Sequence, residues 1–242
     1  MNKEIFLKIS DGIKIAINLY SKARDSVVII CPGWFMTKDS AIFKKMSEDL
    51  FENFDVITMD FRGSGRSRGF YTFSSKEPLD LYCVISYAKK VLEYKNIYLL
   101  GFSLGAAVSV ICSAKNPDVD KLIAVSVPSD FNKIENRMYS PDAWIPTLFQ
   151  KFEPLRWFTI RAGNPFLHKI KPIDVVDDIS APTLFVAGDK DPTVHSWHTK
   201  ALYDKAVCRK VYRLFAKTRH AEDIYHDYPQ EFICMCTDWL NY

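Results

Sequence analysis

Residues 99–105 read LLGFSLG, and this stretch decides how the chain is interpreted. It places Ser103 between Gly101 and Gly105 in a G-x-S-x-G pattern. An apolar, β-prone run precedes the pattern, and small residues compatible with a helix follow it. This context is typical of a serine on a sharp strand-to-helix turn, where the residues two positions away must be small because strand and helix approach closely. We therefore expect Ser103 to project from such a turn as a nucleophile.

Short apolar runs alternate with helical patterns along most of the chain. Alternating apolar and polar residues on both sides of Asp11 and Gly12 predict an antiparallel hairpin at the start. The later apolar runs are typical of strands buried on both faces of a parallel sheet. The sequence therefore predicts an α/β fold, a mostly parallel sheet with helices on both faces. We expect eight strands, at 5–9, 13–19, 27–31, 56–59, 97–100, 122–127, 184–187 and 211–215, and helices at about 41–52, 79–92, 104–114, 197–205 and 229–240.

Residues 128–171 interrupt this alternation, because they contain no strand pattern. They are rich in aromatic residues and contain four internal prolines. A structureless loop of this length would be unusual inside a compact domain. We therefore predict that 128–171 form an inserted lid of short helices on a single domain spanning 1–242, and that some of the lid aromatics line an acyl or aromatic pocket.

Composition and charge exclude several classes of protein. The net charge is +3, and acids and bases are interspersed, whereas a nucleic-acid-binding protein would show a basic stripe. No apolar run approaches the roughly 18 residues that a membrane span requires. The first residues lack the apolar region of an export signal, and the six cysteines lie mostly within apolar patterns, as reduced core residues do. We therefore expect a cytoplasmic protein that binds neither nucleic acid nor a membrane through a span.

A serine nucleophile needs a base within hydrogen-bond reach, and that base needs a carboxylate to orient it. Asp189 and Asp191 directly follow the predicted strand 184–187, and His220 follows the last predicted strand after a short loop. The carboxyl ends of parallel strands meet at one edge of a sheet, where α/β proteins build their sites. The resulting chain order is serine, acid, histidine, which differs from the orders in chymotrypsin-like and subtilisin-like enzymes.

With these features the chain resembles the α/β-hydrolase superfamily over nearly its full length. Residues 60–67, DFRGSGRS, look like the D-x-R-G-x-G-x-S turn of that family, and 188–192, GDKDP, look like its G-D-x-D pattern. The closest likeness is to small cytosolic serine esterases, with monoacylglycerol-lipase-like and serine-aminopeptidase-like relatives. We expect Asp60 and Arg62 of this turn to shape the loop rather than to react.

The resemblance implies a role for each matching residue. Ser103 is the nucleophile, and His220 is the general base and later the general acid. Asp191, the second aspartate of the G-D-x-D pattern, orients the imidazole; Asp189 is the rival acid.

The resemblance also implies an oxyanion hole made of two backbone N–H groups. One belongs to Leu104, the residue after the nucleophile, and the other to Trp34 in the loop after strand 27–31. Most relatives have His-Gly in this loop, where this chain has Pro32 and Gly33. The donor in this loop is a backbone N–H group, so it does not depend on a histidine side chain. We expect the side chains of Trp34 and Phe35 to contribute to substrate binding.

Together these features predict a serine hydrolase that cleaves a small to medium, apolar or aromatic acyl ester through an acyl-enzyme. The same triad would serve a thioesterase, a peptidase or an acyltransferase, and the fold could also serve a non-catalytic binding protein. We predict no metal site, because histidines and carboxylates do not cluster at ligand spacing, and no cofactor. The expected partner is a small-molecule ester; the oligomeric state stays open, with a homodimer as one alternative.

Overall fold

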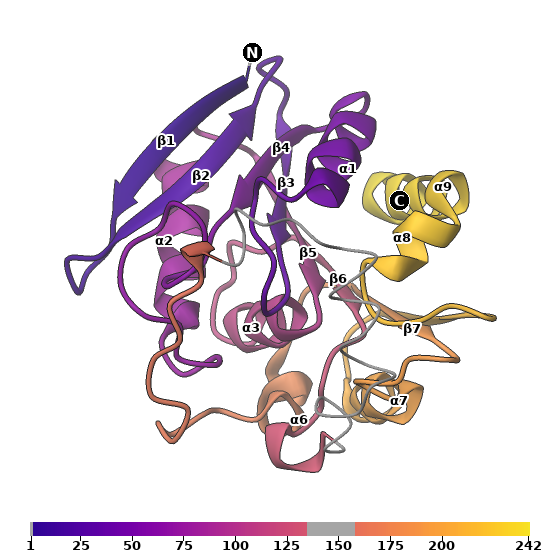
Figure 1. Ribbon diagram of the computed structural model, residues 1–242. Helices are drawn as coiled ribbons and strands as arrows, with labels where there is room; N and C mark the ends of the chain where they lie inside the picture. The colour runs from indigo at the N-terminus through magenta and orange to yellow at the C-terminus, as the bar shows by residue number, and fades with distance from the viewer. Residues whose placement is uncertain (1, 135–157) are drawn as a thin grey trace.

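The computed structural model describes residues 2–134 and 158–242 (Figure 1). Within them, eight strands form one sheet in the order β1-β2-β4-β3-β5-β6-β7-β8. The β1–β2 and β2–β4 pairs are antiparallel, and every later pair is parallel. The strands are β1 (Asn2–Lys8), β2 (Lys14–Tyr20), β3 (Ser26–Cys31), β4 (Asp55–Met59), β5 (Asn96–Phe102), β6 (Lys121–Val125), β7 (Thr183–Gly188) and β8 (Lys210–Phe215).

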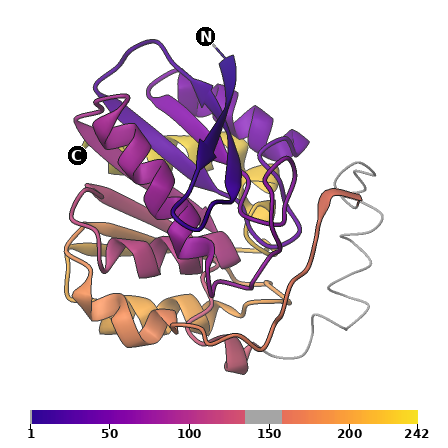
Figure 2. The ribbon, with the colours of Figure 1, turned by 90° about the vertical axis from the view of Figure 1, so that its left-hand side faces the viewer.

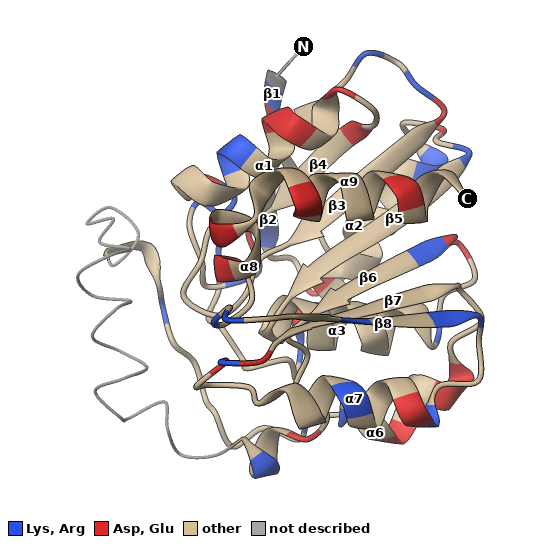
Figure 3. Cartoon of the chain, turned by 90° about the vertical axis from the view of Figure 1, so that its right-hand side faces the viewer, with Lys and Arg blue, Asp and Glu red and all other residues tan. Residues whose placement is uncertain are grey.

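Helices cover both faces of this sheet, and each face has its own apolar core (Figures 1 and 3). Buried side chains of α2, α3 and α7 pack on one face, and those of α1, α8 and α9 on the other. Basic and acidic residues are interspersed on the side seen in Figure 3. The helical elements are α1 (Ala41–Phe51), α2 (Glu77–Lys90), α3 (Leu104–Ser113), η1 (Phe131–Lys133), α6 (Pro172–Val175), η3 (Val176–Asp178), α7 (Ser196–Lys205), α8 (Asp223–Asp227) and α9 (Pro229–Asn241). In the part of the chain that is described, no helix combines the length and apolarity needed to cross a bilayer.

The predicted α/β architecture is confirmed, including the hairpin at the start and the eight-stranded, mostly parallel sheet. The prediction that the last strand is buried on both faces is wrong. Val211 and Leu214 of β8 are 44% and 47% exposed. The reason is topological: β8 pairs only with β7 and forms the edge of the sheet, so the helices cover it incompletely. The short helices α6 and α8 were not predicted, because elements of four or five residues carry too little periodicity.

The predicted lid at 128–171 falls largely on 135–157, which lie outside the described residues. The described segment that follows returns along the loop before α2 (Figure 2). The N–H of Arg161 donates to the Gly63 carbonyl at 2.7 Å, and its carbonyl accepts from the Tyr71 N–H at 2.8 Å. This segment is therefore fastened to the turn at 60–67, while the lid and the single-domain organisation stay predictions.

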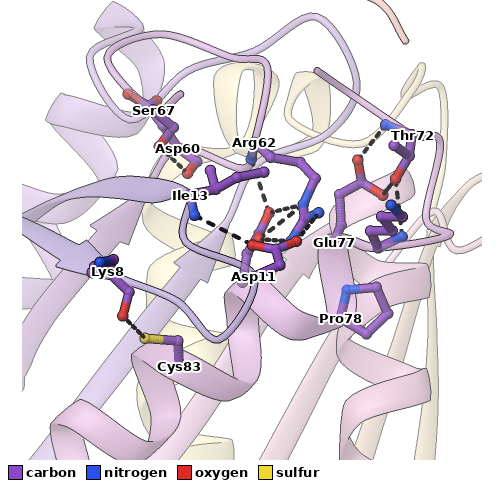
Figure 4. Close-up of polar contacts among 12 residues, drawn as sticks. Lys8, Asp11, Ile13, Asp60, Arg62, Ser67, Thr72, Glu77, Pro78 and Cys83 are labelled. Carbon is purple, nitrogen blue, oxygen red and sulfur yellow. Dashed lines mark hydrogen bonds and ion pairs between the residues drawn. The ribbon is translucent and has the colours of Figure 1, made fainter. Parts of the chain in front are cut away.

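Buried charges hold the turn at 60–67 in place (Figure 4). The guanidinium of Arg62, 1% exposed, donates to Asp80 on α2 at 2.7 Å and to Asp11 in the β1–β2 hairpin at 2.9 Å. Asp60 accepts hydrogen bonds from the N–H of Lys38 at 2.7 Å and of Arg66 at 2.9 Å. Paired, hydrogen-bonded charges are the form in which ions are tolerated in a protein interior. They join the hairpin, the loop after β3 and α2 around one turn.

Candidate active site

Ser103 occupies the junction between β5 and α3 in a backbone conformation that few residues adopt. Its φ is 50° and its ψ −116°, and its N–H donates to the Val125 carbonyl at 2.8 Å. Such a conformation costs of order 1–3 kcal/mol and persists only where the surroundings enforce it. A Cβ on Gly101 would lie 2.6 Å from the Cα of Ala106, and one on Gly105 would lie 2.2 Å from the Cys31 carbonyl oxygen. Both glycines are therefore required by close approach of the backbone.

A chain of hydrogen bonds joins Ser103 to the loops after β7 and β8. The Oγ of Ser103 lies 2.8 Å from Nε2 of His220, and Nδ1 of His220 lies 2.6 Å from Oδ2 of Asp191. These distances are within the range in which a base can accept a hydroxyl proton and a carboxylate can orient that base. The structure thus brings together the three residues that the sequence selected.

The geometry places Asp191, and not Asp189, at the histidine. Asp189 is exposed, whereas Asp191 is 5% exposed, and its second oxygen, Oδ1, accepts the N–H groups of Thr193 at 2.9 Å and Val194 at 2.8 Å. Burial raises the pKa of Asp191, but the charge and hydrogen bond of His220 and these two N–H groups outweigh burial and hold the pKa below its usual value. The carboxylate is therefore ionised at neutral pH and can stabilise a positive charge on the imidazole.

The histidine loop is positioned by contacts that the sequence did not reveal. Ser126, which follows β6 with a φ of 49°, accepts the N–H of Ala221 on its Oγ at 3.0 Å. Lys190, in the aspartate loop, donates its N–H to the Thr218 carbonyl at 3.0 Å. These bonds tie the His220 loop both to β6 and to the loop that carries Asp191. A serine after a strand gives no distinctive pattern, so no sequence signal could have found Ser126.

The loop after β3 lies against the serine. A Cβ on Gly33 would lie 3.2 Å from the Cβ of Ser103. Neither the N–H of Trp34 nor that of Leu104, the first residue of α3, donates a hydrogen bond to any described residue. The first N–H groups of a helix have no partner within it. Two backbone donors, one next to Gly33 and one next to Ser103 in the chain, therefore have no acceptor among the described residues.

The side chain of Trp34 makes aromatic contacts, whereas its backbone carries the N–H group described above. Its ring centroid lies 4.5 Å from that of Tyr71 and 4.7 Å from that of Phe73, which anchors the indole on the loop before α2. Phe35, with a φ of 71°, contacts the indole edge-on at a centroid distance of 6.0 Å. Within the described residues, no group of three His, Cys, Asp or Glu side chains could hold a metal ion.

A family model described as the alpha/beta hydrolase fold matches residues 26–155, more than half of the chain. The chain belongs to the α/β-hydrolase family. The match begins at β3 and includes the Ser103 turn, the loop after β3 and the turn at 60–67. The fold inferred from the G-x-S-x-G context is therefore confirmed.

Other members of the α/β-hydrolase family resemble this chain at low sequence identity. An alpha/beta hydrolase domain-containing protein, WAV2, from Arabidopsis thaliana is 25% identical over 224 residues, covering 86% of this chain and 67% of that protein. The human serine hydrolase BPHL is 23% identical and covers 90% of this chain and 80% of its own length. The esterase Pf2001 of Pyrococcus furiosus superposes with a TM-score of 0.81 at 22% identity, over all of this chain and 91% of that structure. At this identity the superposition shows the fold.

Proposed function

We propose that this α/β-hydrolase family member is a serine hydrolase that cleaves carboxylic esters through an acyl-enzyme intermediate. One observation carries the proposal: a continuous chain of short hydrogen bonds runs from the Ser103 hydroxyl through His220 to the Asp191 carboxylate. A serine becomes a competent nucleophile when a base is held in this geometry by an ionised carboxylate. The named activities of the human BPHL serine hydrolase and of the Pyrococcus esterase are in accord with it.

The reaction follows from the positions of these groups. Ser103 Oγ attacks the ester carbonyl carbon while Nε2 of His220 takes the hydroxyl proton. The carbonyl oxygen becomes an oxyanion that accepts hydrogen bonds from the N–H groups of Trp34 and Leu104. Collapse of this intermediate breaks the bond to the alcohol oxygen, which leaves with the proton from His220. Nε2 of His220 then takes a proton from a water molecule as that water attacks the acyl-serine carbonyl carbon. Collapse of the second intermediate breaks the bond to Ser103 Oγ, which receives the proton from His220, and the acid is released.

The proposed substrate is a small to medium ester with an apolar or aromatic acyl group. The support is the aromatic character of the loop beside the nucleophile, where Trp34 and Phe35 follow Gly33. Aromatic and apolar walls with a few polar groups are typical of sites for small organic molecules. A series of p-nitrophenyl esters of increasing acyl length, compared with the matching thioesters and anilides, tests this choice. Preference for a thioester or an anilide would overturn it.

Labelling with a fluorophosphonate probe tests the nucleophile directly. The wild-type protein should be labelled at Ser103 and should hydrolyse p-nitrophenyl butyrate, and Ser103→Ala should lose both properties. Ser113→Ala is a matched control, because Ser113 lies on the following helix, is buried, and has an Oγ without a hydrogen-bond partner among the described residues. The proposal fails if Ser103→Ala keeps its activity or if the folded wild-type protein is not labelled.

A further inference from the structure

A cavity of about 450 Å³ lies beside the turn at 60–67, away from the proposed active site. Phe6, Lys14, Arg161 and residues 65–68 line it. Lys14 is the first residue of β2, and β2 lies three positions from β5, the strand that precedes Ser103. At the usual strand spacing, three positions correspond to about 14 Å. This cavity is therefore a separate feature of the molecule, and the proposed hydrolytic reaction does not use it.

Four of the lining residues are cationic: Lys14, Arg66, Arg68 and Arg161. Neither Lys14 nor Arg68 forms an ion pair with any described residue. The two are held together by their backbones, since the N–H of Arg68 donates to the Lys14 carbonyl at 2.8 Å. The turn thus brings these two residues together, and neither has an acidic partner within 2–134 and 158–242.

Arg161 is fixed in place by carbonyl oxygens, and it forms no ion pair with a residue that the structure describes. Its Nε donates to the Gly69 carbonyl at 3.2 Å, its Nη1 to the Thr159 carbonyl at 3.1 Å, and its Nη2 to the Ser67 carbonyl. Carbonyl oxygens orient a guanidinium but carry no net charge to cancel it. A guanidinium has five N–H donors, so this side chain keeps donors for a further acceptor.

Among the described residues, Glu4 forms an ion pair with one of these cations, and the buried Asp60 accepts the backbone N–H of Arg66 at 2.9 Å. Glu4 binds Arg66 at 2.7 Å through one carboxylate oxygen, and its other oxygen binds the buried ammonium of Lys38 at 2.9 Å. Glu4 thus contacts two cations, of which Lys38 is also paired with Asp39 at 2.6 Å. The ring of Phe6 lies 5.5 Å from the guanidinium of Arg66, which adds an apolar wall and helps to orient that side chain.

We propose that this cavity binds an organic phosphate, with the phosphate held by the cations and the organic part packed on Phe6. A phosphate monoester carries close to two negative charges at neutral pH and offers several acceptor oxygens, so it matches a cluster of four cations better than one carboxylate does. Guanidinium groups also pair with phosphate through two parallel hydrogen bonds. The volume is that of a small-molecule site and exceeds what a bare phosphate would fill.

Calorimetric titration of the full-length protein with phenyl phosphate tests the proposal. We expect saturable binding that weakens as salt rises, and weaker binding of inorganic phosphate. The variant Lys14→Gln/Arg68→Gln should bind phenyl phosphate at least about tenfold more weakly, the loss expected for one charge-assisted hydrogen bond. Both side chains are exposed, and their backbone hydrogen bond survives the substitution, so the variant should fold. Circular dichroism and the thermal midpoint check this.

A matched control distinguishes a specific binding site from a general attraction of the phosphate to positive charge. Lys90→Gln/Lys115→Gln removes the same charge from two exposed lysines outside the cavity, and its affinity should equal that of wild type. Equal weakening in both double variants, equal affinity for inorganic phosphate, or the absence of binding both to phenyl phosphate and to vesicles that contain phosphatidic acid overturns the proposal.

Co-sedimentation with phosphatidylcholine vesicles, with and without phosphatidic acid, distinguishes the source of the phosphate. Binding to the acidic vesicles that Lys14→Gln/Arg68→Gln abolishes, without saturable binding of phenyl phosphate, assigns the site to a lipid headgroup. The converse result assigns it to a soluble ester. Ser103→Ala should leave the binding unchanged, so this inference and the proposed hydrolase activity succeed or fail separately.

Discussion

Asp191→Asn is the most informative perturbation of the proposed triad, because the structure dictates how the new amide must lie. In the native protein Oδ1 accepts two backbone N–H groups, and Oδ2 faces Nδ1 of His220. The amide oxygen of asparagine will stay on the side of the two N–H groups, since an NH₂ group placed there would face two donors. The NH₂ group must then face His220 and donate to Nδ1. The imidazole proton is thereby forced onto Nε2, which can no longer accept the proton of Ser103.

The size of the effect can be worked out from the geometry. When His220 takes the serine proton, its positive charge lies beside a carboxylate whose oxygen is 2.6 Å from Nδ1. Coulomb's law with an effective dielectric constant of about 20 gives an attraction of roughly 6 kcal/mol at that distance. Each 1.36 kcal/mol corresponds to a tenfold change in rate, so we expect kcat/KM to fall by about four orders of magnitude. The loss known for the wrong histidine tautomer in a Ser-His-Asp enzyme is of the same size.

The assay is the kcat/KM for p-nitrophenyl butyrate at neutral pH, together with the thermal midpoint of each variant. Asp189→Asn is the matched control, because Asp189 lies two residues earlier in the same loop and is exposed. It should keep nearly wild-type activity. If folded Asp191→Asn stayed within about tenfold of wild type, or if Asp189→Asn lost as much, the assigned role of Asp191 would be refuted.

Two further predictions concern stability. Gly105→Ala places a Cβ 2.2 Å from the Cys31 carbonyl oxygen, so the loop after β3 must move; urea unfolding should show a loss of about 3 kcal/mol, with reduced esterase activity. A stable, fully active variant would contradict this. Asp55 accepts hydrogen bonds from the hydroxyls of Ser21 at 2.7 Å and Tyr94 at 2.8 Å. Burial raises the pKa of Asp55, but its hydrogen bonds outweigh burial and lower it. The native carboxylate thus adds stability above pH about 4 that is lost as pH falls further. Asp55→Asn should cost about 3 kcal/mol at pH 7 and less at low pH; a cost independent of pH would contradict the assignment.

The sequence predicted those parts of the fold that depend on local patterns. Six buried or half-buried strands after the hairpin could be placed because each is a short apolar run, and the serine turn could be placed because close packing permits only glycine at 101 and 105. The exposure of β8 could not be predicted in this way. Whether an apolar run lies in the middle or at the edge of a sheet depends on which strands pair, and strand order is a long-range property.

The candidate site shows the same difference between what local sequence patterns predict and what long-range contacts determine. Ser103, Asp191 and His220 follow strands, so their approximate location followed from the rule that strand ends share one edge. The contacts that fix their distances join residues far apart in the chain, such as the bond between Ser126 and Ala221 or the ion pairs of Arg62 with Asp11 and Asp80. Hydroxyl and charged residues occur throughout any sequence, and only the folded chain shows which pairs meet.

The strained serine explains why the loops around it are so closely packed. A residue with a φ of 50° would relax to a common conformation if its neighbours allowed it. Here the N–H of Ser103 is held by the Val125 carbonyl, its own carbonyl accepts the N–H of Ala107, and Gly33 lies directly against its Cβ. Relaxing the turn would break these two hydrogen bonds, which contribute about 0.5–1.5 kcal/mol each, and would disturb that packing; together these offset a strain of about 1–3 kcal/mol. The close packing that forces glycines into the sequence is therefore also what keeps the hydroxyl aimed at His220.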